Sequence, residues 1–167
     1  DKTKLISYPQ GRAASQYVVP LGVTEIGDKA FYYSNITSIV IWQDLEKIAP
    51  NAFVSCTFLS DIYVQNSEHF SSLNGVLFNK DRTLLITHPQ GKDSEEYVIP
   101  DTVVEIEDYA FVDNMYLKNI TIDNCYIEQV IEPRAMVMYV VDVENLTVEN
   151  SFFFGARYKK VYNDAIK

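Results

Sequence analysis

Two stretches of this chain decide its fold: LISYPQGRAASQYVVPLGVTEIGDKAF at Leu5–Phe31 and LITHPQGKDSEEYVIPDTVVEIEDYAF at Leu85–Phe111. They agree at most apolar positions and at a Pro-Gln-Gly turn, always with an offset of 80 residues. Agreement in register over such a length excludes chance. The chain is therefore built from internal repeats, a feature that has to be identified before any fold is assigned.

A shorter repeat lies inside each long one and is marked by an Ala-Phe pair. In the first half of the chain the pair and the apolar residue before it return after 22 residues. The copies are Ile26, Ala30 and Phe31; Ile48, Ala52 and Phe53; Ile106, Ala110 and Phe111; and, with looser spacing, Val130, Ala135 and Met136. Two nested periods are therefore present.

Short apolar triplets fill the space between the Ala-Phe pairs. Each has apolar residues at positions i, i+3 and i+5, and the last two alternate with polar or smaller residues, as in a strand with one buried face. The triplets are Ile36, Ile39, Ile41; Leu59, Ile62, Val64; Leu117, Ile120, Ile122; and Val143, Leu146, Val148. Tyr17–Pro20 and Tyr97–Pro100 fit the same position, each ended by proline. The sequence predicts six short strands and a weaker seventh at Tyr158–Tyr162.

A unit of about 23 residues with one strand and one Ala-Phe pair cannot bury its own apolar face, so it must stack on copies of itself. We therefore expect an α/β repeat solenoid. Short parallel strands form one face, and the Ala-Phe segments return along the other as short helical or 3₁₀ turns. The residue that follows the alanine in each copy should lie in a single apolar interior shared by all the coils. These residues are Phe31, Phe53, Phe111 and Met136. The alternative, amphipathic helix fragments in an unrelated α/β fold, leaves the register unexplained.

Residues 65–96 interrupt the short period. Two strand-like runs, Gly75–Phe78 and Leu84–Thr87, flank a polar turn and predict an inserted β-hairpin. Residues 1–6 align with residues 81–86, inside the turn of that hairpin, so we expect the chain to be a fragment of a longer protein. The predicted single repeat domain consists of the end of a truncated hairpin insert (1–16), two repeats (17–64), the hairpin insert (65–96), two repeats (97–148) and a degenerate repeat or C-terminal cap (149–167).

The repeat unit resembles the BspA-like, treponemal-type leucine-rich repeats, which read approximately I-P-x-x-V-x-x-I-x-x-x-A-F-x-x-C-x-x-L-x-x-I-x-I. Val19–Ile41 and Ile99–Ile122 carry this motif nearly whole, and Cys56 falls on its cysteine position. Gly75–Gly91 resembles the interrupting segment of the same family, and residues 149–167 match poorly. The resemblance implies a right-handed leucine-rich-repeat-like coil. It also implies a secreted or cell-surface protein, similar to adhesins that bind host or matrix proteins.

Composition and missing motifs argue against several classes of function. The formal net charge of −9 argues against nucleic acid as a partner, because phosphate binding needs clustered cations. No apolar run is long enough for membrane insertion of this segment. The sequence contains no nucleophile-elbow, Walker or zinc-ligand motif, and His88 replaces Tyr8 of the other long repeat, which suggests packing and not catalysis. We therefore expect no enzyme activity, no cofactor and no metal. Cys56 and Cys125 are expected to be buried thiols, and a disulfide between them is the minor alternative.

If the apolar positions of the strands point inward, the alternating positions line up between coils as outward columns. The predicted partner-binding residues lie in these columns: Val40, Trp42, Asp61, Tyr63, Gln65, Asn119, Thr121, Asp123, Asn145, Thr147 and Glu149. Trp42, the single tryptophan, falls on the exposed side beside Val40 and Tyr63, and exposed aromatic clusters often dominate binding. The partner class is a protein or a glycan.

Three alternatives stay open at this stage. The hairpin insert could cover Trp42 and make it a core residue. Asp123 and Glu149, neighbours on adjacent coils, could bind a cation, although solvation is favoured because Ca²⁺ takes six to eight oxygens. Finally, the module could be a structural spacer that presents another domain and has no ligand of its own. A spacer predicts an evenly charged sheet, whereas an interaction module predicts a contiguous apolar or aromatic patch.

Overall fold

The computed structural model describes residues 3–11, 15–123, 126–127, 145–149 and 152–153, and within them the chain forms strands and turns but no helix. The six predicted strands are present. Three form one parallel sheet, β2 (Gln16–Val18), β4 (Ser38–Ile41) and β6 (Asp61–Val64). The other three form a second parallel sheet, β10 (Glu96–Ile99), β12 (Asn119–Asp123) and β14 (Asn145–Glu149). The seventh predicted strand lies outside the described residues.

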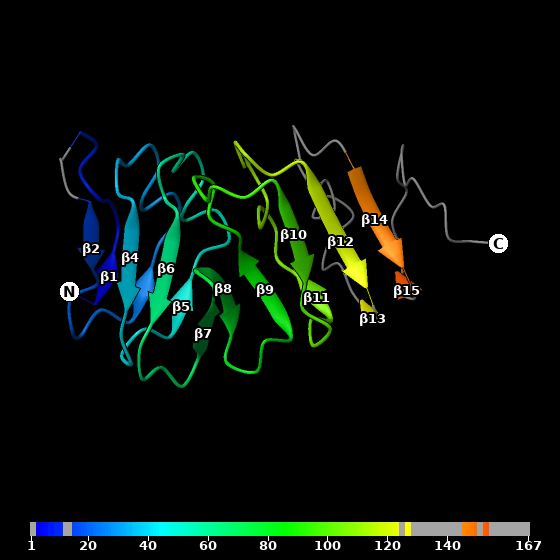
Figure 1. The fold of residues 1–167 in the computed structure, drawn as a ribbon. Coiled ribbons are helices and arrows are strands. Elements are labelled where there is room, and N and C mark those ends of the chain that lie inside the picture. Colours follow the sequence, from blue (N-terminus) through cyan, green and yellow to red (C-terminus); the bar gives the residue numbers. More distant parts are fainter. Residues whose placement is uncertain (1–2, 12–14, 124–125, 128–144, 150–151, 154–167) are drawn as a thin grey trace.

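Strand register follows the repeat. Tyr17 is the Cα partner of Ile39, and Ile39 is the partner of Ile62. Tyr97 and Ile120 are paired in the same way in the second sheet. The predicted columns are therefore correct within each sheet. They are wrong across the whole chain, because the hairpin lies between the two sheets (Figure 1) and no column runs through all six strands.

Very short strands, which were not among those predicted, form the opposite face of the coil. β3 (Glu25–Ile26) lies between β1 (Lys4–Leu5) and β5 (Lys47–Ile48), all parallel. β13 (Tyr126–Ile127) and β15 (Phe152–Phe153) pair in the same sense. Each coil of the described chain is thus a β-solenoid turn with strands on two faces.

The described Ala-Phe segments form successive single turns and no helix, where the sequence predicted short helical or 3₁₀ turns. Around Phe31, the N–H of Tyr32 donates to the carbonyl of Lys29 at 3.0 Å and the N–H of Ser34 donates to that of Phe31 at 2.9 Å. Lys29 and Tyr33 have φ of 52° and 55°. These left-handed residues stop a right-handed helix from continuing past one turn. Tyr109 and Asp113, 80 residues later, have φ of 62° and 53°.

The small side chain of alanine lets adjacent turns bond through their backbones. The N–H of Tyr8 donates to the carbonyl of Ala30 at 2.6 Å, and the N–H of Phe31 donates to that of Ala52 at 3.0 Å. In the second long repeat the N–H of His88 donates to Ala110 at 2.8 Å. Ala30, Ala52 and Ala110 therefore each accept a backbone hydrogen bond from the preceding coil.

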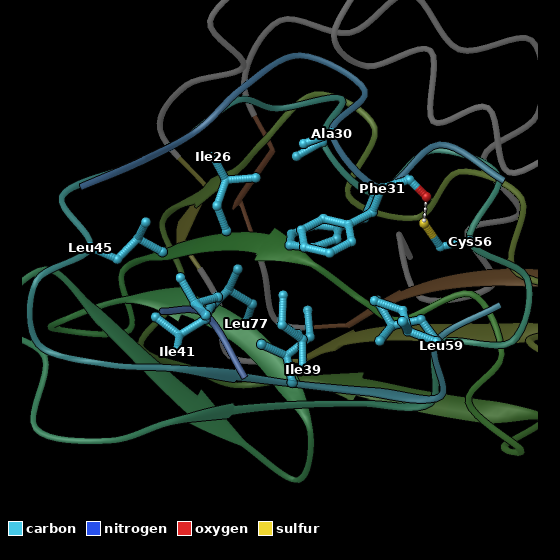
Figure 2. Close-up of a cluster of buried hydrophobic side chains, with 14 of the residues drawn as sticks. Ile26, Ala30, Phe31, Ile39, Ile41, Leu45, Cys56, Leu59 and Leu77 are labelled. Carbon is cyan, nitrogen blue, oxygen red and sulfur yellow. Dashed lines mark hydrogen bonds between the residues drawn. The ribbon is translucent and has the colours of Figure 1, made fainter. Parts of the chain in front are cut away.

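The first hydrophobic core lies between the two faces of the N-terminal coils (Figure 2). Phe31 is fully buried in it and stacks on Phe53, with ring centroids 5.4 Å apart. Ile39, which precedes Val40, points into the same cluster from the sheet. Burying side chains of this size contributes roughly 1.5 to 3 kcal/mol each.

The predicted hairpin is present and belongs to a larger insert. β8 (Val76–Asn79) pairs antiparallel with β9 (Leu84–Thr87), and also with β7 (Phe70–Leu73), a strand that the sequence analysis did not predict. β9 then pairs parallel with β11 (Glu105–Ile106), as β1 does with β3 in the first repeat. The insert thus takes part in the solenoid through its last strand.

The insert divides the interior into two cores. Successive residues of β8 point to opposite faces. Leu77 packs in the first core, whereas Val76 and Phe78 pack in the second core with Phe111. The predicted single interior is therefore wrong, because Phe31 and Phe53 share one cluster and Phe111 belongs to another. Met136 lies outside the described residues.

The insert also closes the open edge of the first sheet. The N–H groups of Ile62 and Val64 point away from β4 and donate to Gly75 O at 2.9 Å and Ser72 Oγ at 3.1 Å. Gly75 has φ of 80°, and a Cβ there would lie 2.3 Å from Asp61 Oδ1. Only glycine therefore fits at this approach. β10 consequently begins a separate sheet instead of pairing with β6.

Candidate functional site

An apolar patch lies on the outward face of the first sheet, at the centre of the predicted site. Val18, Val40 and Tyr63 are lateral neighbours on β2, β4 and β6. Trp42 follows Val40 by two residues and is half-buried. Val18 and Tyr63 are 46% and 43% exposed. We call Val18, Val40, Trp42 and Tyr63 the outward patch.

Val40 is only 7% exposed, although it was expected on the surface. It belongs to neither core cluster, so the core does not bury it. Its neighbours on the adjacent strands are Val18 and Tyr63, and Trp42 follows it two residues along the chain. Trp42 also belongs to neither core cluster, which argues against the alternative of a core tryptophan. The sheet register therefore brings Val18, Val40 and Tyr63 side by side on the outward face.

A polar row borders the patch on the side where the strands begin. It consists of Gln16, Ser38 and Asp61, which are lateral partners. Asp61 accepts from Ser60 Oγ at 2.8 Å and forms an ion pair with Lys92 Nζ at 3.4 Å. Lys92 could not be predicted from the sequence as a neighbour of this row, because its contact with Asp61 depends on the path of the insert. Asp61 is thus held in place at the end of the patch.

The remaining predicted residues do not join this patch. Gln65 is exposed just beyond the end of β6. Asn119 and Thr121 lie half-buried in the second sheet. The backbones of Asp123 and Glu149 are partners there, as are those of Asn119 with Asn145 and Thr121 with Thr147. The described structure does not include the side chains of Asp123, Asn145, Thr147 and Glu149. The predicted site therefore divides between two sheets.

The histidine in the second long repeat has a packing role, as predicted. The His88 ring lies 4.7 Å from Tyr97 and 5.6 Å from Phe111. Tyr8 makes the same arrangement with the two equivalent rings, at 5.0 and 5.7 Å. His88 Nδ1 bonds to Asn114 Oδ1 at 2.5 Å, and burial lowers its pKa from 6.5 to about 4. A group buried in this way is poorly placed to act as a general base.

His88 should make the protein sensitive to acid. Its pKa is lower in the folded than in the unfolded chain, so unfolding takes up a proton between pH 6.5 and about 4. The free energy of unfolding should therefore fall as the pH drops through this window, by on the order of 3 kcal/mol in full. Urea denaturation at a series of pH values measures this loss. In His88→Tyr, which copies Tyr8, the loss should be smaller; identical pH profiles for the two proteins would contradict the assignment.

Cys56 is a free, buried thiol next to Phe31. Its Sγ donates to the carbonyl of Phe31 at 2.8 Å (Figure 2) and lies 3.6 Å from Ser34 Oγ. Burial raises the pKa of Cys56 to about 11, so the thiolate is disfavoured. Ser34 and Asn114 occupy the equivalent positions of their repeats, and both are buried. This position is structural. Cys125 lies outside the described residues.

The described part of the chain contains neither a cluster of metal-binding side chains nor a membrane-spanning helix. Within it, His, Cys, Asp and Glu side chains do not gather in threes in a way that could hold a metal ion. The same residues include no helix long and apolar enough to span a bilayer.

Comparison with known proteins places the repeats in a family. The profile described as the BspA type leucine rich repeat region matches in six copies, over residues 12–91 and 90–153. Among curated proteins, none matches the chain.

Three solved bacterial structures share the fold. A leucine-rich repeat protein from Eubacterium ventriosum is 23% identical, with a TM-score of 0.62 over 85% of this chain and 42% of its own. A leucine-rich cell surface protein from Faecalibacterium prausnitzii is 26% identical, with a TM-score of 0.56 over 65% of this chain and 35% of its own.

The third structure is the pneumococcal vaccine antigen PcpA, which is 24% identical, with a TM-score of 0.58 over 81% of this chain and 40% of its own. The chain therefore spans less than half the length of each of these proteins. The matched repeats cover most of the sequence, and so the chain belongs to the BspA-type leucine-rich repeat family.

Proposed function

We propose that this chain is a non-enzymatic interaction module of a secreted or cell-surface protein, and that it binds a host or matrix protein or a glycan. The outward patch is the binding site in this proposal. The observation that carries it is the burial of Val40 outside both cores. Side chains that cover one another on the outer face form a continuous apolar surface, which a spacer with an evenly charged sheet would not have.

Two further observations support the proposal. Similar proteins include one described as a cell surface protein and one described as a vaccine antigen, both terms that fit an extracellular location. The patch also combines a tryptophan and a tyrosine, the residue types that most often dominate binding energy at protein interfaces. Asn119 and Thr121, with the outward positions Asp123, Asn145, Thr147 and Glu149, would extend the contact onto the second sheet.

The patch can be tested by truncating its two aromatic side chains. Trp42→Ala and Tyr63→Ala should each weaken binding by at least about tenfold, because they are the two aromatic side chains of the patch. The immobilised protein is probed with purified extracellular-matrix proteins and with an array of defined oligosaccharides. The melting temperature should change little, because neither residue belongs to a core cluster.

Matched controls come from the turns. Tyr33→Ala and Phe58→Ala remove exposed aromatic side chains away from the outward sheet and should leave binding unchanged. Unchanged binding in the Trp42 and Tyr63 variants would exclude the outward patch as the site. Absence of binding to every probe would favour the structural spacer.

A further inference from the structure

The charged residues at the outward positions of the main strands are acidic. Among the outward positions whose side chains the structure describes, and the residues that follow the strands, the charged side chains are Asp61 and Glu96, and none is a cation. The positions are Gln16, Val18 and Pro20; Ser38, Val40 and Trp42; Asp61, Tyr63 and Gln65; Glu96, Val98 and Pro100; and Asn119 and Thr121. This face is therefore apolar at its centre and acidic at its border.

Carboxylates flank the patch at both ends of the strands. Asp61 lies where β6 begins. Asp44, two residues past Trp42, lies in the loop that follows β4, where its Oδ2 accepts from the backbone N–H of Gly22 at 2.8 Å. The N–H of Gly22 is a neutral donor, so this hydrogen bond leaves the negative charge of Asp44 in place. The patch therefore has a carboxylate at each end, and Asp61 is the one that already pairs with a lysine, Lys92.

Two lysines of the described chain form ion pairs where these strands begin. Lys92 pairs with Asp61 across 3.4 Å, which is long for an ion pair, and Lys118 pairs with Glu95 at 2.6 Å. Asp44 and Glu96 form no ion pair with any cation in the described part of the chain. Together with the net charge of −9, this leaves the face with unneutralised negative charge.

We propose that the outward patch binds a basic, apolar polypeptide segment. Its apolar side chains would cover Val18, Val40, Trp42 and Tyr63, and its Lys or Arg side chains would reach Asp61 and Asp44. This assignment rests on the proposed function and names the chemistry of the partner. An anionic glycan would be repelled by the acidic border.

Trp42, the single tryptophan, provides a fluorescence probe inside the site. The protein is titrated with three acetylated, amidated heptapeptides: alternating Lys and Leu, alternating Glu and Leu, and alternating Lys and Ser. The Lys-Leu peptide should change the Trp42 emission and bind at least about tenfold more tightly than either of the others, with an affinity that falls as salt is raised. Anisotropy of labelled peptides measures the same affinities independently of Trp42.

Variants that lack a carboxylate test whether the acidic border of the patch, and not the net charge of the protein, determines the affinity. Asp61→Asn combined with Asp44→Asn should weaken binding of the Lys-Leu peptide by at least about fivefold. The control Glu25→Gln removes a carboxylate from β3, on the opposite face, and should leave the affinity unchanged. Equal weakening in the control, or equal affinity for the Lys-Leu and Glu-Leu peptides, would overturn the proposal.

If the assignment of a basic partner is wrong, the outward patch can still be the binding site. If a neutral oligosaccharide or an acidic protein binds, and Trp42→Ala and Tyr63→Ala abolish that binding, the patch is the site but the basic partner is wrong. If those variants bind every probe as the unmodified protein does, both proposals fail.

Discussion

Phe31→Ala should lower the free energy of unfolding by about 3 to 5 kcal/mol, the range typical of a phenylalanine removed from a packed core. Phe31 is fully buried, and its ring is in contact with three others, Tyr8, Tyr17 and Phe53, at centroid distances of 5.7, 5.5 and 5.4 Å. The variant would leave a cavity where two coils meet. Urea denaturation followed by Trp42 fluorescence measures the loss.

Phe58→Ala is the matched control for this substitution. Phe58 is also a phenylalanine of the turn region, but its side chain is 60% exposed. The same change of residue should therefore cost less than about 1 kcal/mol there. Similar losses in the two variants would mean that Phe31 is not packed between coils as described.

Leu77→Ala should lower the free energy of unfolding by about 2 to 5 kcal/mol. Leu77 is a residue of the insert, yet its side chain is fully buried in the first core between the faces of the N-terminal coils (Figure 2). A hairpin that only decorated the solenoid would tolerate the change. Leu21→Ala, an exposed leucine of the loop after β2, should be nearly neutral in the same urea experiment. A nearly neutral Leu77→Ala would show that the insert does not complete the first core.

The six main strands could be predicted because apolar residues recur at a fixed spacing in their sequences. The i, i+3, i+5 triplets fixed both the strand positions and the in-register pairing of Tyr17, Ile39 and Ile62. The short strands of the opposite face could not be predicted in this way. β3 has two residues, and alternation needs a longer run than that to be recognised.

The division into two cores depends on the insert, whose pairing lies outside the repeat period. β7 reads Phe-Ser-Ser-Leu, and its two serines hide the strand signal. Ser72 nevertheless helps to close the edge of β6, and this closure separates the two sheets. Regularly stacked coils predict one continuous core. The insert strand β8 instead directs alternate side chains into two different cores.

Only part of the candidate site could be predicted from the sequence. Alternation placed Val40, Trp42 and Tyr63 outward, but it could not show that Val40 is buried there. Burial on the outer face depends on the sizes of lateral neighbours, which become known only with the register. The role of Lys92 depends on the path of the insert back to Asp61, and no local pattern indicates it.

The most direct test of the structure asks whether the insert couples the two cores. Phe78 is buried in the second core, whereas Trp42 reports on the first sheet. Urea unfolding of Phe78→Ala is followed by Trp42 fluorescence and by far-ultraviolet circular dichroism. We predict that both transitions shift together to lower urea, because β8 contributes side chains to both cores. An unshifted Trp42 transition, with only the dichroism signal moving, would contradict the shared insert strand.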